Sequence, residues 1–165
     1  MADPVLSEPR PDEARPSRDR VRYEDDTHAW ALEQARLLRS GRLDAVDAEH
    51  VAEELESLGR SEFAKLRSSL RVLVMHMLKW DQQPEHRTAS WIFSIREQRR
   101  RYEQVLRENP SLTPRRAAAL AEAYEEARLW AANETHLEPD EFPDSCPYTW
   151  DDIVDRPFDF DSLKK

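Results

Sequence analysis

The sequence predicts an all-α fold, namely an antiparallel bundle of about four helices followed by a short C-terminal helix. Apolar residues recur every three or four positions over several long stretches, which is the spacing of one face of an α-helix. Glycine occurs only 2 times in 165 residues, whereas β-hairpin turns and phosphate-binding loops depend on it. Hydrophobic residues make up 39% of the chain, which is enough for one core. These observations favour a soluble helical protein over a β-rich one.

The first helix is expected to begin near Asp25 or Asp26 and to end near Ser40. Either aspartate can accept hydrogen bonds from the unpaired N–H groups of a first helical turn. Gly41 stands where a left-handed residue commonly ends a helix. Between these signals, the residues with helical spacing are Trp30, Gln34, Leu37 and Leu38.

One long second helix is expected from about Asp47 to Gln82, because Pro84 disfavours a helical conformation in the residue before it. Its apolar stripe consists of Val51, Leu55, Leu58, Leu66, Leu70, Leu73, Met77 and Trp80. A glycine inside a helix costs about 1 kcal/mol relative to alanine, so Gly59 is the position at which this helix would kink or break if it did so. We expect the first helix to lie on the first half of the second. A break at Gly59 would let it complete a compact four-helix bundle.

Two further long helices are expected. The third begins at Thr88 or Ser90 and ends at Asn109-Pro110. The fourth extends over 113–133, because Thr113-Pro114 is a threonine cap followed by a proline at the first helical position. The loops are short, so consecutive helices should be antiparallel, with the second half of helix two and helices three and four forming a three-helix core.

The C-terminal tail is expected to cross this bundle as a strap. Thr149 and Asp152 resemble a capping box in which aspartate replaces glutamate, and they predict a short helix over 150–154. The apolar anchors of the strap are Phe142, Tyr148, Trp150, Ile153 and Phe158.

The chain is therefore expected to have three parts: a disordered proline-rich arm at 1–22, a helical bundle at 23–136 and an acidic strap at 137–165. The net charge of −9 is unevenly distributed. Acidic residues dominate positions 24–58 and the strap, whereas basic residues dominate positions 59–107. We favour mutual pairing of these segments within the fold over an external nucleic-acid surface.

The sequence predicts a cytoplasmic protein that has no membrane partner, metal or cofactor. The single cysteine, Cys146, excludes an internal disulfide and fits a reducing compartment. No apolar run is long enough to span a membrane or to act as a signal peptide. His50 and Glu54 share a helix face, as two metal ligands would, but the Glu-x-x-His motif of helical di-iron proteins is missing from the sequence.

Several short motifs together resemble one known family. They are EELESLGRSE at 53–62, MHMLKW at 75–80, Gln83-Pro84, SWIFSIREQRRR at 90–101 and CPYT at 146–149. This set resembles an uncharacterised bacterial all-helical family, domain of unknown function number twenty-nine, over about Tyr23 to Asp155. The resemblance implies an α-helical fold and implies no activity.

One group of residues around the turn at Pro84 is the first candidate for a functional cluster. Its members are His76, Lys79, Trp80, Arg87, Trp91, Arg96 and Glu97. A histidine beside lysine and arginine side chains can have a lowered pKa and act as a general base. We favour the alternative of a structural cluster, in which Trp80 stacks near Trp91 and Glu97 pairs with Lys79 or Arg96.

The third helix also carries a basic stripe, made of Arg96, Arg99, Arg100 and Arg101. Such a stripe can contact nucleic-acid phosphates, although no helix-turn-helix signature accompanies it. Pairing of this face with the acidic strap explains the same residues, and a strap that mimics phosphate would cover the face until a partner displaced it.

No catalytic constellation assembles in the sequence. We therefore expect a non-catalytic protein-interaction or accessory module, such as an adaptor or an antitoxin-like binding partner, that acts through a protein partner or self-association. The second hypothesis is nucleic-acid binding through the third helix. The third is an enzyme that uses His76 with Lys79 or Glu97.

Overall fold

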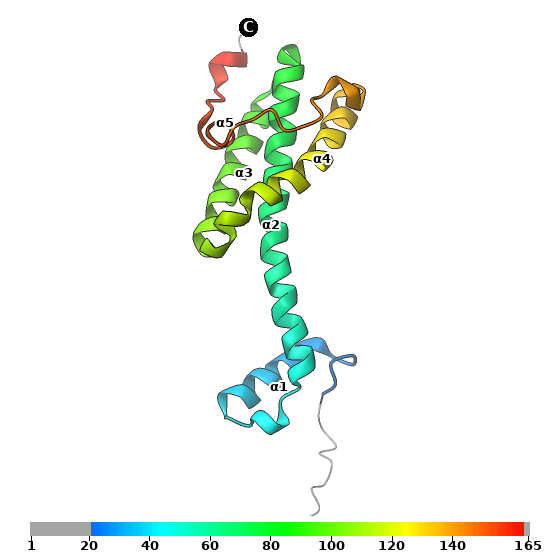
Figure 1. The fold of residues 1–165 in the computed structure, drawn as a ribbon, viewed down its shortest axis with the longest axis vertical. Coiled ribbons are helices and arrows are strands. Elements are labelled where there is room, and N and C mark those ends of the chain that lie inside the picture. Colours follow the sequence, from blue (N-terminus) through cyan, green and yellow to red (C-terminus); the bar gives the residue numbers. More distant parts are fainter. Residues whose placement is uncertain (1–20, 164–165) are drawn as a thin grey trace, which may run out of the picture. The chain divides into compact units, whose positions relative to one another are not determined.

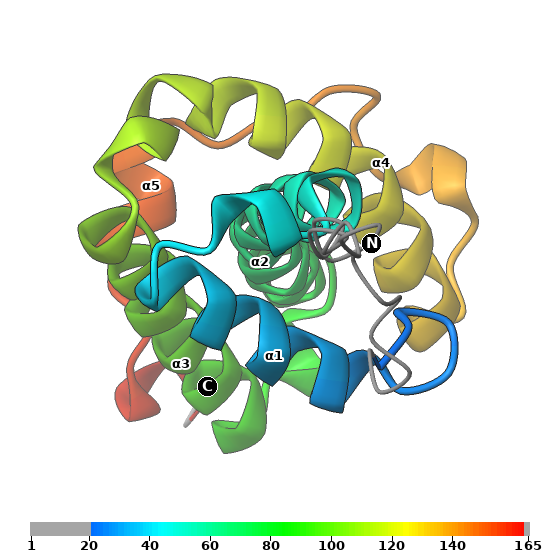
Figure 2. The ribbon, with the colours of Figure 1, turned by 90° about the horizontal axis from the view of Figure 1, so that it is seen from below.

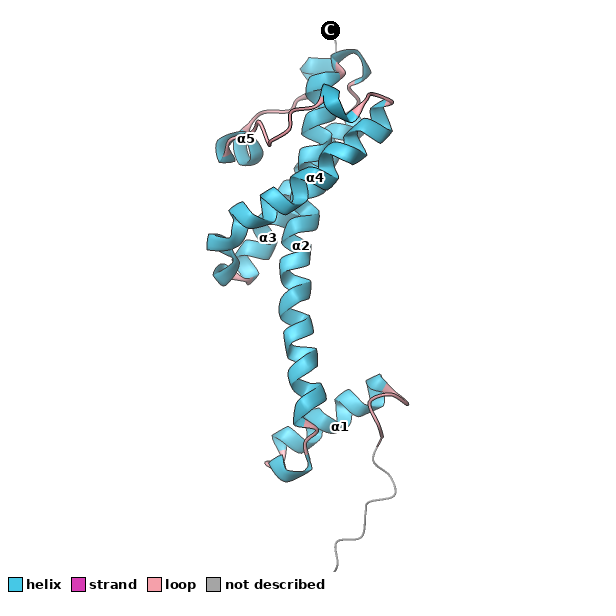
Figure 3. Cartoon of the chain, turned by 45° about the vertical axis from the view of Figure 1, so that its right-hand side comes forward, coloured by secondary structure: helices cyan, strands magenta, loops and turns pink. Residues whose placement is uncertain are grey.

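The computed structural model describes residues 21–163 of the chain. The predicted disordered arm lies outside this range, apart from its last two residues. The described residues form an all-α fold without strands, as predicted (Figure 3). The helices are α1 (Thr27–Arg39), α2 (Ala48–Gln82), α3 (Ala89–Glu108), α4 (Arg116–Thr135) and α5 (Trp150–Asp155). Every helix in this range is too short or too polar to cross a lipid bilayer.

The chain divides into two compact units, with the boundary between Glu54 and Leu55 inside α2. We call the described residues 21–54 the N-terminal unit and residues 55–163 the C-terminal unit. Helix α2 is continuous through Gly59, so the break considered for this position does not occur. Because of this division, the two units are described separately.

In the N-terminal unit, α1 packs on the beginning of α2, as predicted. The Asp26 side chain caps α1 by accepting a hydrogen bond from the N–H of Ala29 at 2.9 Å, and Gly41 follows the helix with a left-handed φ of 72°. A short 3-10 helix, Leu43–Ala45, then turns the chain toward α2. Trp30 and Leu37 of α1 are almost completely buried, so they form the small core of this unit.

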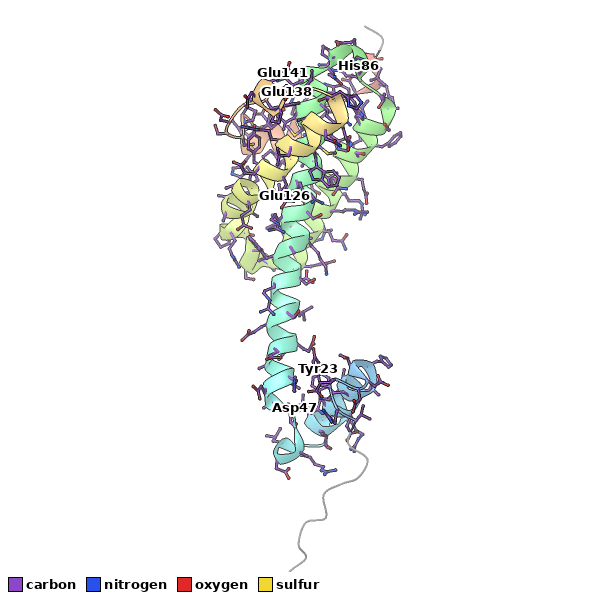
Figure 4. All side chains as sticks on the ribbon, turned by 90° about the vertical axis from the view of Figure 1, so that its right-hand side faces the viewer. Tyr23, Asp47, His86, Glu126, Glu138 and Glu141 are labelled. Carbon is purple, nitrogen blue, oxygen red and sulfur yellow. The ribbon has the colours of Figure 1, made fainter. Side chains whose placement is uncertain are left out.

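In the C-terminal unit, α3 and α4 flank the second part of α2 (Figures 1 and 2). The three helices share an apolar core, which confirms the predicted three-helix arrangement. Basic residues of α2 pair with acidic residues of α4 at a constant sequence offset. The pairs are Arg67–Glu122, Arg71–Glu126 (Glu126 is labelled in Figure 4) and Lys79–Glu134. Because the offset is constant, α2 and α4 run in the same direction. This is expected, since α3 lies between them in the sequence and runs antiparallel to both.

Two helix starts differ in detail from the prediction. Helix α4 begins at Arg116, because Pro114 belongs to a preceding 3-10 helix, Pro110–Arg115, and Thr113 makes no capping hydrogen bond. Thr88 does precede α3, but its hydroxyl lies 2.8 Å from the Ser90 hydroxyl and caps no backbone N–H. The local sequence thus predicted both helices. The first residue of α4 differs from the prediction because a 3-10 helix precedes it.

The C-terminal segment crosses the bundle and carries α5 (Figure 1). We call its described residues, 137–163, the strap. The predicted capping box is present, since Thr149 Oγ1 accepts from Asp152 N and the Asp152 side chain accepts from Thr149 N. Phe142, Ile153 and Phe158 are buried in the core. Full burial of such a side chain contributes about 1.5–3 kcal/mol, so the strap is an integral layer of the unit.

Candidate functional site

Lys79 lies at the centre of the predicted cluster and links three helices. It belongs to α2 and is only 5% exposed. Its ammonium group lies 4.4 Å from the centre of the Trp91 ring of α3 and pairs with the Glu134 carboxylate of α4. A buried ammonium group is tolerated when it is paired and hydrogen-bonded, and these two partners meet that need. Sequence reasoning missed Glu134, which lies in a different helix.

His76 lies one turn before Lys79 and is partly buried. Its Nδ1 is 2.9 Å from the Val72 carbonyl oxygen, which accepts a hydrogen bond from Nδ1–H. Burial lowers the pKa of His76, the charge of Lys79 lowers it further, and the Val72 bond and Glu134 offset part of this shift. His76 is therefore neutral near pH 7, with Nε2 as its acceptor nitrogen. This agrees with the expected lowered pKa, although burial is the main cause.

Trp80 and Arg87 form a compact pair at the end of α2. Arg87 Nε donates a hydrogen bond of 2.9 Å to the Trp80 carbonyl, and its guanidinium lies 4.7 Å from the Trp80 ring centre. Within residues 21–163, the aromatic ring that packs against Trp80 is Phe158 of the strap, edge-on at 5.4 Å. The prediction that Trp80 stacks with Trp91 is therefore wrong, because the ring that contacts Trp80 is that of Phe158 in the strap.

Glu97 is paired with arginines of its own helix. Its carboxylate accepts hydrogen bonds from Arg100 and Arg101 on the same helix, at 2.8–2.9 Å. Those bonds lower the pKa of Glu97 to about 2. The expected pairing of Glu97 with Lys79 or Arg96 is not found, because residues three and four positions later on the helix are closer.

Arg99, a member of the predicted basic stripe, is bound to the strap. Its Nε donates to the Ile153 carbonyl at 2.7 Å, and its two terminal nitrogens donate to the carbonyls of Asp152 and Arg156 at 2.9 and 2.8 Å. These carbonyls belong to the C-terminal end of α5, where helices have unpaired acceptors and a partial negative charge. Arg99 thus caps α5.

Arg96 also contacts the strap, because its Nη2 donates to the Phe158 carbonyl at 3.0 Å. The strap therefore contacts Arg96 and Arg99 through backbone carbonyls, where we expected acidic side chains. Arg100 and Arg101 keep Glu97 as their partner. The four arginines consequently do not form one continuous exposed stripe.

A second polar cluster lies in the N-terminal unit, around Asp47 (Figure 4). Asp47 Oδ2 accepts a hydrogen bond from Trp30 Nε1 at 3.3 Å and lies 2.8 Å from His50 Nδ1. The ring of Tyr23 stacks on His50 with 4.4 Å between centres. The Tyr23 hydroxyl donates a hydrogen bond to Glu54. Among residues 21–163, no group of three or more His, Cys, Asp or Glu is placed to hold a metal ion.

The charge of Asp47 determines which ring nitrogen of His50 carries the proton. Burial alone would raise the pKa of Asp47, but hydrogen bonds from His50 and Trp30 outweigh it and lower that pKa. The hydrogen bond to Asp47 raises the pKa of His50. Because Asp47 is ionised, His50 donates from Nδ1, and Nε2 is left to face Glu24 Oε1 at 4.0 Å.

These groups line a pocket of about 380 Å³ in the N-terminal unit. Its apolar lining comes from Trp30, Leu37, Ala45 and Val46, and its charged lining from Arg22, Glu24, Glu33, Asp47 and His50. From the sequence, His50 was considered together with Glu54, and its contact with Asp47 was not predicted. The available signal was the Asp-x-x-His spacing at a helix start, which sets both side chains over the first turn.

The geometry defines an all-α protein in which the predicted cluster joins helices of the C-terminal unit, while Asp47 and His50 line a pocket of the N-terminal unit. The sequence model of the domain of unknown function DUF29 matches residues 22–159, and the chain belongs to this family. This result confirms the resemblance carried by the short motifs. No curated protein and no solved structure matches the chain.

Proposed function

We propose that this protein is a non-catalytic protein-interaction module, acting as an accessory or antitoxin-like partner. The observation that carries the proposal is a pair of exposed leucines on α2 in the C-terminal unit. Leu55 is 64% exposed and Leu58 is 58% exposed. They are three positions apart and so lie on one side of the helix. Two adjacent apolar side chains in this position favour contact with another protein surface.

The helix around these leucines supports the same proposal. Every residue from Leu55 to Ser61 is exposed, including Gly59, which is a poor helix former. A stretch of helix without packing contacts is marginally stable in water. An apolar partner surface would stabilise it by burying both leucines.

The alternatives receive less support. Nucleic-acid binding through the third helix needs Arg99, whose donors are engaged by the end of α5. Catalysis by His76 needs Lys79 or Glu97 as an available partner, but Lys79 is paired with Glu134 and Glu97 accepts hydrogen bonds from Arg100 and Arg101. We keep a cytoplasmic location as a proposal, because the single Cys146 fits a reducing compartment.

Site-specific photo-crosslinking in the native host tests this proposal. The photoreactive residue p-benzoylphenylalanine replaces Leu55, Leu58 or, as a control, Leu129, which is 55% exposed on α4. We expect one defined cross-linked species from positions 55 and 58, identified by mass as another protein or a second copy, and lost when the neighbouring leucine becomes glutamine. The same pattern from position 129, or no species from 55 and 58, would overturn the proposal.

A further inference from the structure

A groove lies beside the exposed leucines of α2 in the C-terminal unit. Four residues of α2 and the last residue of the following 3-10 helix Pro110–Arg115 line it, namely Glu56, Gly59, Arg60, Phe63 and Arg115. Its volume of about 440 Å³ lies within the range of about 300–1,000 Å³ that is common for binding sites. Gly59 follows Leu58 directly and lies one turn after Leu55, so the groove adjoins the leucine pair.

The apolar part of the groove is accessible. Phe63 is only partly buried, since it packs on the core and also lines the groove. A Cβ atom added at Gly59 would meet no other atom within 4 Å, so the space beside this residue is open. Glycine permits close approach to the backbone. A side chain from outside can therefore contact Phe63 without displacing a core residue.

Arg115 is the polar feature of the groove that points to a ligand. Its guanidinium lies 4.1 Å from the centre of the Phe63 ring, which is a cation–π contact. Within residues 21–163, no carboxylate forms an ion pair with Arg115. The planar guanidinium can bind a carboxylate through two parallel hydrogen bonds. Arg115 is thus held in place by an aromatic ring while its donors remain available.

A second cation lies in the same groove. Arg60 Nη1 is 3.5 Å from Glu56 Oε2, and the two side chains are 69% and 74% exposed. An exposed pair of this kind is weak, so Arg60 can also interact with an incoming carboxylate. The lining therefore contains two cations and one carboxylate, and its charge is complementary to an anionic group.

We propose that this groove binds an acidic segment of the partner protein. An aspartate or glutamate of that segment pairs with Arg115 and Arg60, and an adjacent apolar side chain contacts Phe63. The inference rests on the proposed function, because the leucine pair beside the groove would hold the same partner. Phosphates of a nucleic acid would also be attracted to the two arginines, but the apolar floor and the neighbouring leucines favour a protein segment.

Charge reversal at Arg115 tests the inference in the full chain. The photoreactive residue p-benzoylphenylalanine is placed at Leu58, and the yield of the cross-linked species in the native host is compared between Arg115→Glu and Arg107→Glu. Arg107 is exposed on α3 and lies outside the groove lining, so its reversal changes the net charge equally. We expect Arg115→Glu to lower the yield about tenfold and Arg107→Glu to leave it unchanged. Arg115→Gln, which removes the charge without reversing it, should lower the yield as well.

The outcomes separate this inference from the proposed function. A cross-linked species that persists in both Arg115 variants, or that is lost equally in Arg107→Glu, would overturn the acidic-segment inference and leave the proposed function intact. Failure to obtain any species from Leu58 with Arg115 unchanged would overturn both.

A photoreactive residue at Glu56, inside the groove, identifies the chemistry of the bound segment. We expect mass spectrometry to find an aspartate or glutamate beside the attachment point in the partner. A partner peptide without an acidic residue there, or a species that disappears after nuclease treatment, would overturn the inference.

Discussion

The buried charged side chains of the C-terminal unit and the polar cluster of the N-terminal unit differ in their surroundings. In the C-terminal unit, Lys79 and Arg99 point inward, where Glu134 and the carbonyls at the end of α5 take up their hydrogen bonds. In the N-terminal unit, Asp47 and His50 line an open pocket. Lys79 and Arg99 therefore connect elements of the fold, whereas Asp47 and His50 also line a cavity. Residue type alone does not separate these roles; burial and hydrogen-bond partners do.

The largest effect that would test this comparison is expected at Arg99. Arg99→Ala removes the cap from α5 and leaves three carbonyls without their donor, so we expect the free energy of unfolding to fall by about 2–4 kcal/mol. The neighbouring Arg100→Ala loses an exposed pair with Glu97 and an exposed hydrogen bond to Gln104, and its expected change is within about 0.5 kcal/mol. Urea unfolding measures both variants.

Equal stability of these two arginine variants would break the comparison, because it would mean that the strap does not depend on Arg99. A loss of nucleic-acid affinity in a fully stable Arg99→Ala variant would instead revive the second hypothesis of the sequence analysis.

Those features of the fold that depend on residues close in the chain could be predicted from the sequence. The Asp26 cap, Gly41 and the Thr149–Asp152 box are signals within a single turn, and each marks a helix end as expected. The partner of Lys79 lies 55 positions away on α4, and that choice depends on how two helices align. The ring against Trp80 comes from Phe158 in the strap, even farther along the chain. Local spacing contains no information about either contact.

The pocket was missed for a related reason. Its wall needs the 3-10 helix Leu43–Ala45 to bring Ala45 and Val46 against Trp30. Three residues are too few to produce a periodic pattern. The spacing of Asp47 and His50 can be seen in the sequence. The same spacing also occurs where an aspartate caps an ordinary helix and a histidine follows in the first turn, so it does not indicate a pocket.

A smaller effect is expected in the pKa values of His50 and His76, which shift in opposite directions. The pKa of His50 is raised by its hydrogen bond to Asp47, and that of His76 is lowered mainly by burial. In an NMR titration, His50 should therefore protonate above the ordinary histidine value of 6.5 and His76 below it.

The same shifts set a pH window for the N-terminal unit. The stabilisation from His50 is complete below its unfolded pKa and is lost as pH rises through the raised folded value. The stabilisation from Asp47 is present above its unfolded pKa, near 3.8, and is lost as pH falls through its lowered folded value. In a His50→Gln variant, the loss of stability as pH rises through the folded pKa of His50 should be absent. Persistence of that loss in the variant would remove His50 as its cause.

The most direct test of the central claim is the stability of the isolated Leu55→Gln/Leu58→Gln double variant. If both leucines serve a partner surface, the free energy of unfolding of the purified protein should change by no more than about 0.5 kcal/mol, as for exposed positions. A loss of about 2 kcal/mol or more, the scale of removing buried leucine packing, would show that the leucines stabilise the chain itself and would contradict the interaction proposal.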